Sequence, residues 1–389
     1  MIPGPDSFPR IGVVSSGDPK DRNFSSGIAY YTSRKLGESC GSVEYLGPLS
    51  SPFLHVGRVY NDLSRLLFRK NYDFLHSVAL SRSYARALIP RVARGRFDLL
   101  FAPEASTEIA FLDVDIPTVY MSDSTFALMV DYYPFFRNLT RRSLKNGDMI
   151  ERMAIEKAAA VVYETRWAAD SAIRDYGADE EKVHVVPAGP NLDVDPGRET
   201  ATRKRETEVC RLLFVGVEWF RKGGDIAVDA CFHLQRAGFP YQLVICGCEP
   251  PHGLSGLNVT VIPFLNKNDP VQKQRLMGLY AWADFLFLPT RAETFGFVFC
   301  EAAAFGLPVI TTATGGVPEV VLHGKTGFTL PPGSTGEEYA ELICRVFSDD
   351  RLYQRLRECA REEYEKRLNW DAWAERMREI IQGVLERRG

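Results

Sequence analysis

Residues 293–301 read ETFGFVFCE, and they are followed by AAAFGLPVI up to residue 310 and by GGVPE at 315–319. The stretch comes after an apolar run typical of a buried strand, and it begins a predicted helix. In open parallel sheets, ligands bind where strands end, because helix amino termini there present unpaired N–H groups to anionic groups. This stretch therefore predicts a parallel α/β sheet with a ligand site at its carboxyl edge.

Glu293 and Glu301 are the two carboxylates of this stretch, one in the loop and one inside the helix. Both can accept hydrogen bonds from neighbouring hydroxyls, which sugars and riboses offer in pairs. Alternatively, Glu293 is a first-turn acid that favours the helix dipole, and Glu301 is an exposed helix residue. Against the second alternative, Val298, Phe299 and Cys300 precede Glu301 and alanines follow it, so we expect buried surroundings in which a carboxylate needs partners.

A second segment, FVGVEWFRKGG at 214–224, has a strand that runs into Gly216 and then two cations, Arg221 and Lys222, before a helix. An arginine fork and a compact lysine charge suit a diphosphate. A solvated Arg-Lys pair in a surface turn is the alternative, and the motif alone does not separate the two. The position in the order of elements favours the phosphate site.

The first half of the chain alternates apolar runs with segments of helical length, which is the rhythm of a parallel sheet. Its first strand is followed by a loop rich in Gly, Asp, Asn and Ser that ends at Gly27. This arrangement of strand, glycine loop and helix is Rossmann-like. The expected strands of this half are residues 11–16, 98–103, 117–122, 159–163 and 182–187.

A length of 389 residues favours two domains. We predict a first Rossmann-like domain at 1–190, a polar linker at 191–210, a second Rossmann-like domain at 211–366 and a final helix at 367–389. The final helix carries apolar residues at helical spacing that need a surface to bury them. In the second domain we expect strands at 212–215, 241–246, 259–263, 285–288, 308–312 and 328–330 and a helix near 225–235.

These residues, in this order, resemble the retaining glycosyltransferases of family 4, which have the GT-B fold. The resemblance covers nearly the whole chain, and its most specific part is the E-x7-E element from Glu293 to Glu301. It implies an α/β protein in which two Rossmann-like parallel-sheet domains face a cleft and the carboxyl-terminal helix crosses back to the first domain. It also implies transfer of a sugar from a nucleotide diphosphate donor, with UDP favoured over GDP, to a glycan, lipid-linked or small-molecule acceptor.

The resemblance assigns roles to single residues. Glu301 would hold the ribose hydroxyls, and Arg221 and Lys222 the diphosphate. Transfer would retain the anomeric configuration through front-face attack, without a cofactor, a metal or a covalent nucleophile. The donor-binding residues that it implies are Gly27, Gly216, Arg221, Lys222, Phe264, Leu265, Glu293, Thr294, Phe295, Gly296, Phe297 and Glu301, with the base near Phe264 and Leu265 and the sugar near residues 293–297.

The sequence departs from the family pattern in two places. Val217 follows Gly216 where many members have an arginine nearby, so the phosphate charge must rest on Arg221 and Lys222. Many members also have a histidine near the sugar, whereas the segment here is YMSDSTF, with Asp123 as the nearest polar candidate for a catalytic role. An N-cap for the following helix explains Asp123 equally well.

The amino-terminal MIPGPDSFPR lacks the apolar stretch of a signal peptide, and no run of eighteen apolar residues occurs. We therefore expect a cytoplasmic protein, with eight reduced and mostly buried cysteines and no nucleic-acid partner. Contact with the inner face of the cell membrane stays open for two reasons. Residues 56–97 carry nine basic residues against Asp62 and Asp73, each basic residue contributing about 1 kcal/mol near anionic lipid, although a solvated helical face is the commoner explanation. The aromatic run at 132–136 could serve a lipid-linked acceptor, but packing is favoured.

Two other functions fit the same architecture, because a fold does not settle chemistry. One is a nucleotide-sugar epimerase or hydrolase, which would change the donor without an acceptor. The other is a catalytically inactive glycan-binding protein, against which the intact pair of glutamates argues.

Overall fold

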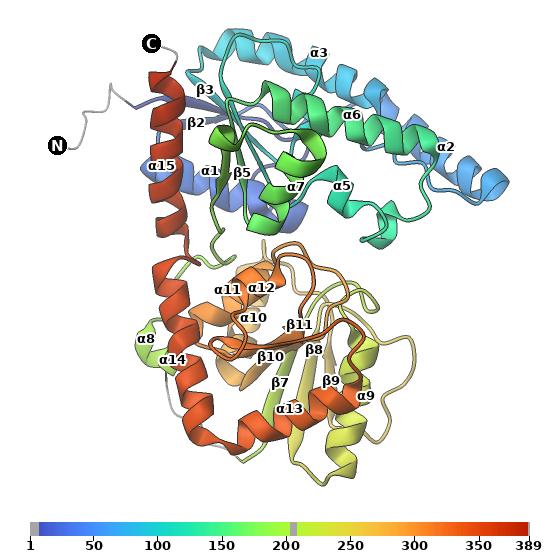
Figure 1. Ribbon diagram of the computed structural model, residues 1–389, viewed down its shortest axis with the longest axis vertical. Helices are drawn as coiled ribbons and strands as arrows, with labels where there is room; N and C mark the ends of the chain where they lie inside the picture. The colour runs from blue at the N-terminus through green and yellow to red at the C-terminus, as the bar shows by residue number, and fades with distance from the viewer. Residues whose placement is uncertain (1–7, 203–207, 388–389) are drawn as a thin grey trace. The chain divides into compact units, whose positions relative to one another are not determined.

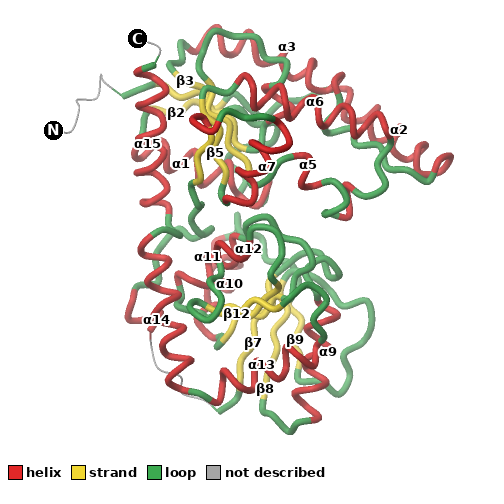
Figure 2. Tube along the Cα trace, viewed as in Figure 1, coloured by secondary structure: helices red, strands yellow, loops and turns green. Residues whose placement is uncertain are grey.

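The computed structural model describes residues 8–202 and 208–387, and the chain divides into two compact units. The first unit comprises Met1–Pro187 and Trp370–Gly389, and the second comprises Ala188–Asn369. Figure 2 shows strands at the centre of each unit and helices around them. The fold is α/β, with one six-stranded parallel sheet in each unit.

The sheet of the first unit has the order β2-β1-β3-β4-β5-β6. Its interior strands are the apolar runs of the sequence, and every residue of β3, β4 and β5 is buried, as expected for a sheet covered on both faces. The strands are β1 (Arg10–Val13), β2 (Ser42–Tyr45), β3 (Leu99–Pro103), β4 (Thr118–Ser122), β5 (Ala160–Tyr163) and β6 (Val183–Val185).

Two predictions for this sheet were wrong. The first strand ends at Val13 rather than at residue 16, because the chain then turns and the Ser15 hydroxyl donates to the Gly17 carbonyl at 3.1 Å. Strand β2 was missed, because an edge strand with the sequence SVEY is half exposed and carries no apolar run.

Helices cover both faces of this sheet (Figure 1). On one face, α3 and α6 pack over a core that includes Leu88, Leu100 and Ala154. The helices of the first unit are α1 (Ile28–Ser39), α2 (Pro52–Phe68), α3 (Val78–Gly95), α4 (Ser106–Ile109), α5 (Phe126–Met129), α6 (Arg141–Lys157), α7 (Arg166–Tyr176) and α15 (Trp370–Glu386).

The final helix, α15, packs on α1 and the other face of the first sheet. Trp370 stacks on Tyr31 with 5.9 Å between ring centroids, and Lys35 pairs with Asp371 at 2.5 Å. Trp373 is fully buried against Phe101 of β3. The apolar stripe of this helix thus has the partner surface that its spacing required.

The sheet of the second unit has the order β12-β11-β10-β7-β8-β9, and all of its strands are parallel. All six strands expected here are present, within two residues at each end. They are β7 (Cys210–Val215), β8 (Tyr241–Cys246), β9 (Val259–Ile262), β10 (Phe285–Leu288), β11 (Val309–Thr312) and β12 (Gly327–Leu330).

The helices of the second unit include one within the segment expected to be a linker. Residues 203–207 of that segment lie outside the described residues, but α8 precedes them and packs against α14, where Arg357 donates to the Ala201 carbonyl at 2.6 Å. These helices are α8 (Arg198–Thr202), α9 (Gly224–Arg236), α10 (Pro270–Trp282), α11 (Phe297–Ala304), α12 (Val317–Val320), α13 (Gly336–Ser348) and α14 (Asp350–Lys366).

All eight cysteines are free thiols, and six of them are buried. Within residues 8–202 and 208–387, no three His, Cys, Asp or Glu side chains are grouped so that they could hold a metal ion. None of the helices that the structure describes is both long enough and apolar enough to cross a membrane.

The first unit contains several buried ionisable groups. Glu151 of α6 is 1% exposed and accepts a hydrogen bond from the Tyr120 hydroxyl at 3.1 Å. Burial raises the pKa of Glu151 to about 7, although the nearby His76 opposes the shift. Asp73 and His76 form a pair at 2.7 Å, in which the pKa of Asp73 is lowered and that of His76 is raised by their mutual attraction, which outweighs the opposing effect of burial.

The raised pKa of Glu151 predicts a pH-dependent stability. Between its unfolded value and about 7, the folded state holds one more proton than the unfolded state, so the free energy of unfolding falls as pH rises. Relative to Glu151→Gln, the wild type should lose about 2 kcal/mol between about pH 5.5 and 8. Urea unfolding of both proteins at the two pH values measures this difference, and parallel pH profiles would contradict it.

Candidate functional site

The order of strands in the second sheet creates a switch point between β7 and β10. The chain proceeds from β7 outward to β8 and β9, and then returns to add β10, β11 and β12 on the other side. The connections that leave β7 and β10 therefore diverge at the carboxyl edge, which is where open α/β sheets bind ligands. Both predicted site segments, 214–224 and 293–301, follow these two strands.

Lys222 and Glu293 meet at this switch point although 71 positions separate them. The Lys222 ammonium donates to the Glu293 carboxylate, and both side chains are about nine-tenths buried. The parallel pairing of Leu286 with Leu213 sets the register that brings them together. Burial lowers the pKa of Lys222, while the Glu293 charge opposes that shift.

Arg221 lies beside this pair. Its Nη1 is 3.8 Å from the Glu293 carboxylate and donates to the Ala292 carbonyl at 3.0 Å. Its Nε donates to Glu218, which is half exposed. The two predicted cations thus share one acidic neighbour, and the interpretation of the pair as solvated side chains in a surface turn is wrong.

Glu301 is fully buried in α11, as the apolar residues around it predicted. One of its oxygens accepts a hydrogen bond from the Tyr280 hydroxyl at 2.5 Å, and the other accepts from Lys267 Nζ at 3.1 Å. A carboxylate can accept about four hydrogen bonds, so acceptor capacity remains. Tyr280 and Lys267 were missed, although the position of Lys267 soon after β9, at the same sheet edge, is a signal that could have found it.

At three of the predicted positions, the local structure explains why the residue is a glycine. Gly296 precedes α11 with φ of +86°, and a Cβ there would come within 2.5 Å of the Phe299 ring. A Cβ on Gly216 would lie 2.8 Å from Cγ of Lys222, so this glycine makes room for the lysine stem. Gly27, in the first unit, precedes α1 with φ of +83°.

The remaining donor residues differ in exposure. Thr294 and Phe295 are buried, and the Phe295 ring contacts that of Phe297 at 5.6 Å. After β9, Leu265 is buried, whereas Phe264 is 53% exposed. The segment expected to lie near the base therefore offers an aromatic face to solvent.

Asp123 follows β4 in the first unit, and it is not the N-cap of the next helix. Thr125 is that N-cap, since its side chain accepts from the Leu128 amide, so the structure contradicts the alternative that explained Asp123 as a cap. The Asp123 carboxylate instead accepts from the Ser124 hydroxyl at 3.2 Å.

Glu104 is a site candidate that sequence reasoning missed. It follows β3 with φ of +50°, a backbone conformation rare outside glycine, and the Ser25 hydroxyl donates to its carboxylate. Burial and then the Asp123 charge raise the pKa of Glu104 to about 8. Strand order puts a second switch point between β1 and β3, where Ser25, Gly27 and Glu104 follow the strands. The sequence signal that could have found Glu104 is its position directly after the strand expected at 98–103.

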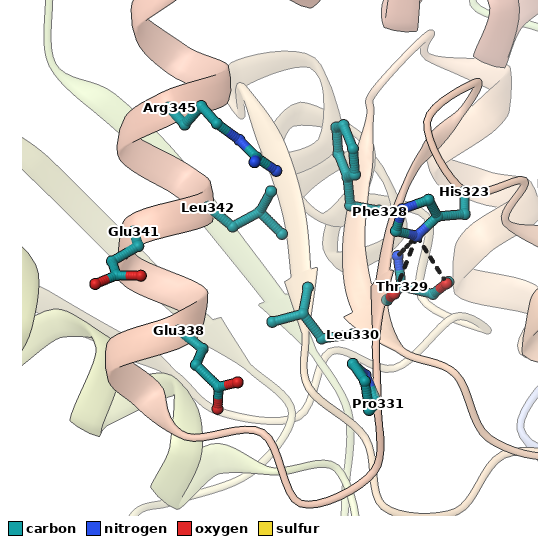
Figure 3. Close-up of a pocket in the computed structure, with 9 residues that line it drawn as sticks. All are labelled: His323, Phe328, Thr329, Leu330, Pro331, Glu338, Glu341, Leu342 and Arg345. Atoms are coloured by element: carbon teal, nitrogen blue, oxygen red, sulfur yellow. Dashed lines mark hydrogen bonds between the residues drawn. The ribbon is translucent and has the colours of Figure 1, made fainter.

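A separate groove of about 350 Å³ lies between β12 and α13 in the second unit (Figure 3). Phe328 and Leu330 of β12 face Leu342 and Arg345 of α13, and His323 hydrogen-bonds to Thr329. The nine residues that line it include none of the predicted site residues.

Two family models match this chain, one in each half. A family model described as Glycosyltransferase Family 4 matches residues 28–194, and one described as Glycosyl transferases group 1 matches residues 210–349. The chain belongs to glycosyltransferase family 4. The membership agrees with the α/β fold and its two parallel six-stranded sheets.

Curated relatives are similar over part of their length. The chain is 31% identical over 260 residues to a D-inositol 3-phosphate glycosyltransferase of Xylanimonas cellulosilytica, a match that covers 61% of this chain and 60% of that protein. A protein with the same description from Corynebacterium jeikeium is 27% identical over 265 residues, which is 62% of this chain and 63% of the relative. The matches thus span about three fifths of the relatives.

Solved structures match nearly the whole fold. Sucrose-phosphate synthase from Thermosynechococcus elongatus gives a TM-score of 0.69 at 17% identity, covering 97% of this chain and 99% of that one. Anabaena HepE, solved in complex with UDP-glucose, gives 0.64 at 18% identity, covering 96% and 99%. At these identities the likeness establishes the fold of this family 4 chain.

The Lys222–Glu293 contact predicts strong energetic coupling. In Lys222→Met, the buried Glu293 loses its closest cation, and we expect the free energy of unfolding of the second unit to fall by about 3 kcal/mol. In the double variant with Glu293→Gln, the loss should be at least about 1 kcal/mol smaller than the sum of the two single losses.

The matched control is the exposed pair Arg291–Asp225, in which both side chains are 40% or more exposed. Its cycle, Arg291→Met with Asp225→Asn, should give a coupling below about 1 kcal/mol. Urea unfolding of all variants measures both cycles. Additive losses at Lys222 and Glu293 would show that the contact does not hold the site together.

Proposed function

We propose that the protein is a retaining, metal-independent glycosyltransferase that uses a nucleotide diphosphate sugar. The observation that carries this proposal is the convergence of Lys222, Arg221 and Glu293 at the switch point of a parallel sheet, next to the helix that holds the buried Glu301. Family membership supports transferase chemistry, and the UDP and UDP-glucose complexes of the structural relative HepE favour UDP as the donor nucleotide.

The donor would be recognised at both ends of this site. A diphosphate carries negative charge that Arg221 and Lys222 can neutralise, and without a donor the Glu293 carboxylate occupies those cations. We propose that donor binding shares or displaces this contact, which places Glu293 beside the sugar. Glu301, already oriented by Tyr280 and Lys267, would accept hydrogen bonds from the ribose hydroxyls.

The reaction breaks the bond between the anomeric carbon and the phosphate oxygen and forms one to an acceptor oxygen on the same face of the sugar. The acceptor proton passes to the departing phosphate, and the nucleoside diphosphate leaves with its charge held by Arg221 and Lys222. Because these side chains supply the positive charge, no metal is required. Gly27 would approach the phosphates, and Phe264 and Leu265 the base.

The acceptor would be a sugar, a lipid-linked sugar or a small polyol. Asp123 and Glu104 support an acceptor role for the first unit, because they follow adjacent strands, β4 and β3. The D-inositol 3-phosphate acceptor in the names of the curated relatives makes a polyol the first compound to test. We further propose a cytoplasmic location.

The donor site predicts selective stabilisation by one nucleotide. In a thermal-shift comparison of UDP, GDP and ADP, UDP at about a hundred times its dissociation constant should add about 2.7 kcal/mol of stability. Glu301→Gln should weaken UDP binding about ten-fold or more. The variant loses the negative charge that strengthens the hydrogen bonds from the ribose hydroxyls, and such charged hydrogen bonds contribute about 1.5 to 3 kcal/mol each.

Glu341→Gln, at an exposed position of α13, is the control and should bind UDP like the wild type. If no nucleoside diphosphate shifts the melting temperature, or if Glu301→Gln binds UDP normally, the assignment of the site is wrong.

The two units should differ in which kinetic parameter their variants change. Lys222→Ala should lower kcat about a hundred-fold, because it removes charge stabilisation of the leaving diphosphate. Asp123→Asn should lower transfer to the acceptor while the UDP-induced thermal shift stays unchanged. Product analysis with and without acceptor provides the readout, and donor consumption that ignores the acceptor would indicate an epimerase or hydrolase instead.

A further inference from the structure

Helix α2 is attached to the first unit through its small and polar residues. Its buried residues are Gly57, Asn61 and Ser64. The Asn61 side chain accepts from the Tyr72 amide at 2.8 Å, and the Ser64 hydroxyl donates to the Lys70 carbonyl at 2.8 Å. These bonds fix which face of the helix is turned towards the protein.

Gly57 confirms the orientation. A Cβ at this position would come within 2.4 Å of Phe74, so the helix lies so close to the segment after it that only glycine fits. The rotation of α2 about its own axis is therefore set by close packing and by satisfied hydrogen bonds.

The opposite face of α2 is apolar and lies in solvent, which reverses the usual arrangement of a surface helix. Its residues recur at helical spacing and are between 48% and 77% exposed: Val56, Val59, Tyr60, Leu63, Leu66 and Leu67. Phe68, the last residue of the helix, is also 69% exposed. A contiguous apolar patch of this kind on a protein surface indicates a binding site.

Basic side chains surround one end of this stripe. Arg65, Arg69 and Lys70 lie at the end of α2, and all are exposed. The loop before α6 is tied to them, since Asn138 donates to the Arg69 carbonyl and Asn71 donates to the Arg137 carbonyl at 2.7 Å. That loop and the first turn of α6 bring further exposed cations, namely Arg137, Arg141 and Arg142.

The aromatic run at 132–136 contributes little to this surface. Tyr132 packs on Trp167 at 5.7 Å, and Phe136 packs on Phe126 at 5.9 Å, while Phe135 is 39% exposed. The interpretation of the run as packing is thus confirmed for these two rings. Figure 1 shows that one end of α2 projects beyond the other helices of its unit.

We propose that α2 docks the protein on the surface of an anionic phospholipid bilayer. The apolar stripe would enter the boundary between headgroups and acyl chains, while the basic residues at its end meet the lipid phosphates. A second copy of the chain fits less well, because its α2 could cover the apolar stripe but would bring the same positive charge rather than anionic groups to the basic residues. The inference concerns a partner surface and does not depend on the transferase assignment.

Vesicle sedimentation of the full chain tests this docking. We expect binding to phosphatidylcholine vesicles that contain about 30% phosphatidylglycerol, and binding at least about ten-fold weaker to phosphatidylcholine alone. Raising the salt to about 0.5 M should also weaken it, because the charges on the surface are then screened.

Variants separate the apolar stripe from the charge. Leu63→Asp with Leu67→Asp should weaken binding at least about ten-fold. Arg69→Ser with Lys70→Ser should weaken binding to anionic vesicles about ten-fold and leave the weak binding to neutral vesicles unchanged. Val271→Asp, at a position of α10 that is 76% exposed, is the matched control and should bind like the wild type.

All four altered positions of α2 and its end are exposed, so the melting temperature and the UDP-induced shift should not change. These two readouts keep a failure of docking distinct from a failure of the donor site. A wild type that does not sediment with anionic vesicles, or a Leu63→Asp, Leu67→Asp variant that binds normally, would overturn the proposal. So would a wild-type dimer in light scattering that this double variant dissociates, since the stripe would then bind a second copy.

Discussion

The parallel pairing of β10 with β7 is the constraint on which the candidate site depends. Strands β8 and β9 are added on one side of β7, and β10 is added on the other side. The connections that leave β7 and β10 therefore run in opposite directions from the carboxyl edge of the sheet. One connection brings Arg221 and Lys222, and the other brings Glu293. A shift of one residue in the register would turn each strand's side chains to the opposite face and separate the loops. The chemistry of the second unit is thus a consequence of strand order.

The same rule applies in the first unit. There β2 is added on one side of β1 and β3 on the other, so Ser25 and Glu104 meet although 79 positions separate them. The two units use opposite charges at this position, because cations dominate beside Glu293 whereas carboxylates gather around Glu104 and Asp123. A cationic edge suits a diphosphate, and an acidic edge suits hydroxyl groups. This difference in charge is the physical basis for proposing donor and acceptor roles for the two units.

Burial makes these charges informative. An ion pair on the surface contributes little, but removing one partner from a buried pair leaves an uncompensated charge at a large cost. Lys222, Glu293 and Glu301 are all at most about a tenth exposed, and each has an oppositely charged or hydrogen-bonding neighbour. On α2, the situation is reversed, since a stripe of apolar side chains is exposed whereas the polar side chains of Asn61 and Ser64 are buried. In the candidate donor site charged residues are buried, and on α2 apolar residues are exposed. Both departures from the usual distribution between core and solvent support a functional proposal.

The sequence by itself determined the α/β class, nearly all of the strands, the final helix and the two motifs, because period and composition report on burial along a single chain. It also indicated that Glu301 is buried, since apolar neighbours surround it. Only the tertiary structure decided that Lys222 contacts Glu293, that Tyr280 and Lys267 hold Glu301, and that Glu104 lies near Asp123. It also decided that α2 turns its apolar stripe outward. The physical reason is that periodicity identifies the faces of an element but not its neighbours, which strand order and packing alone select.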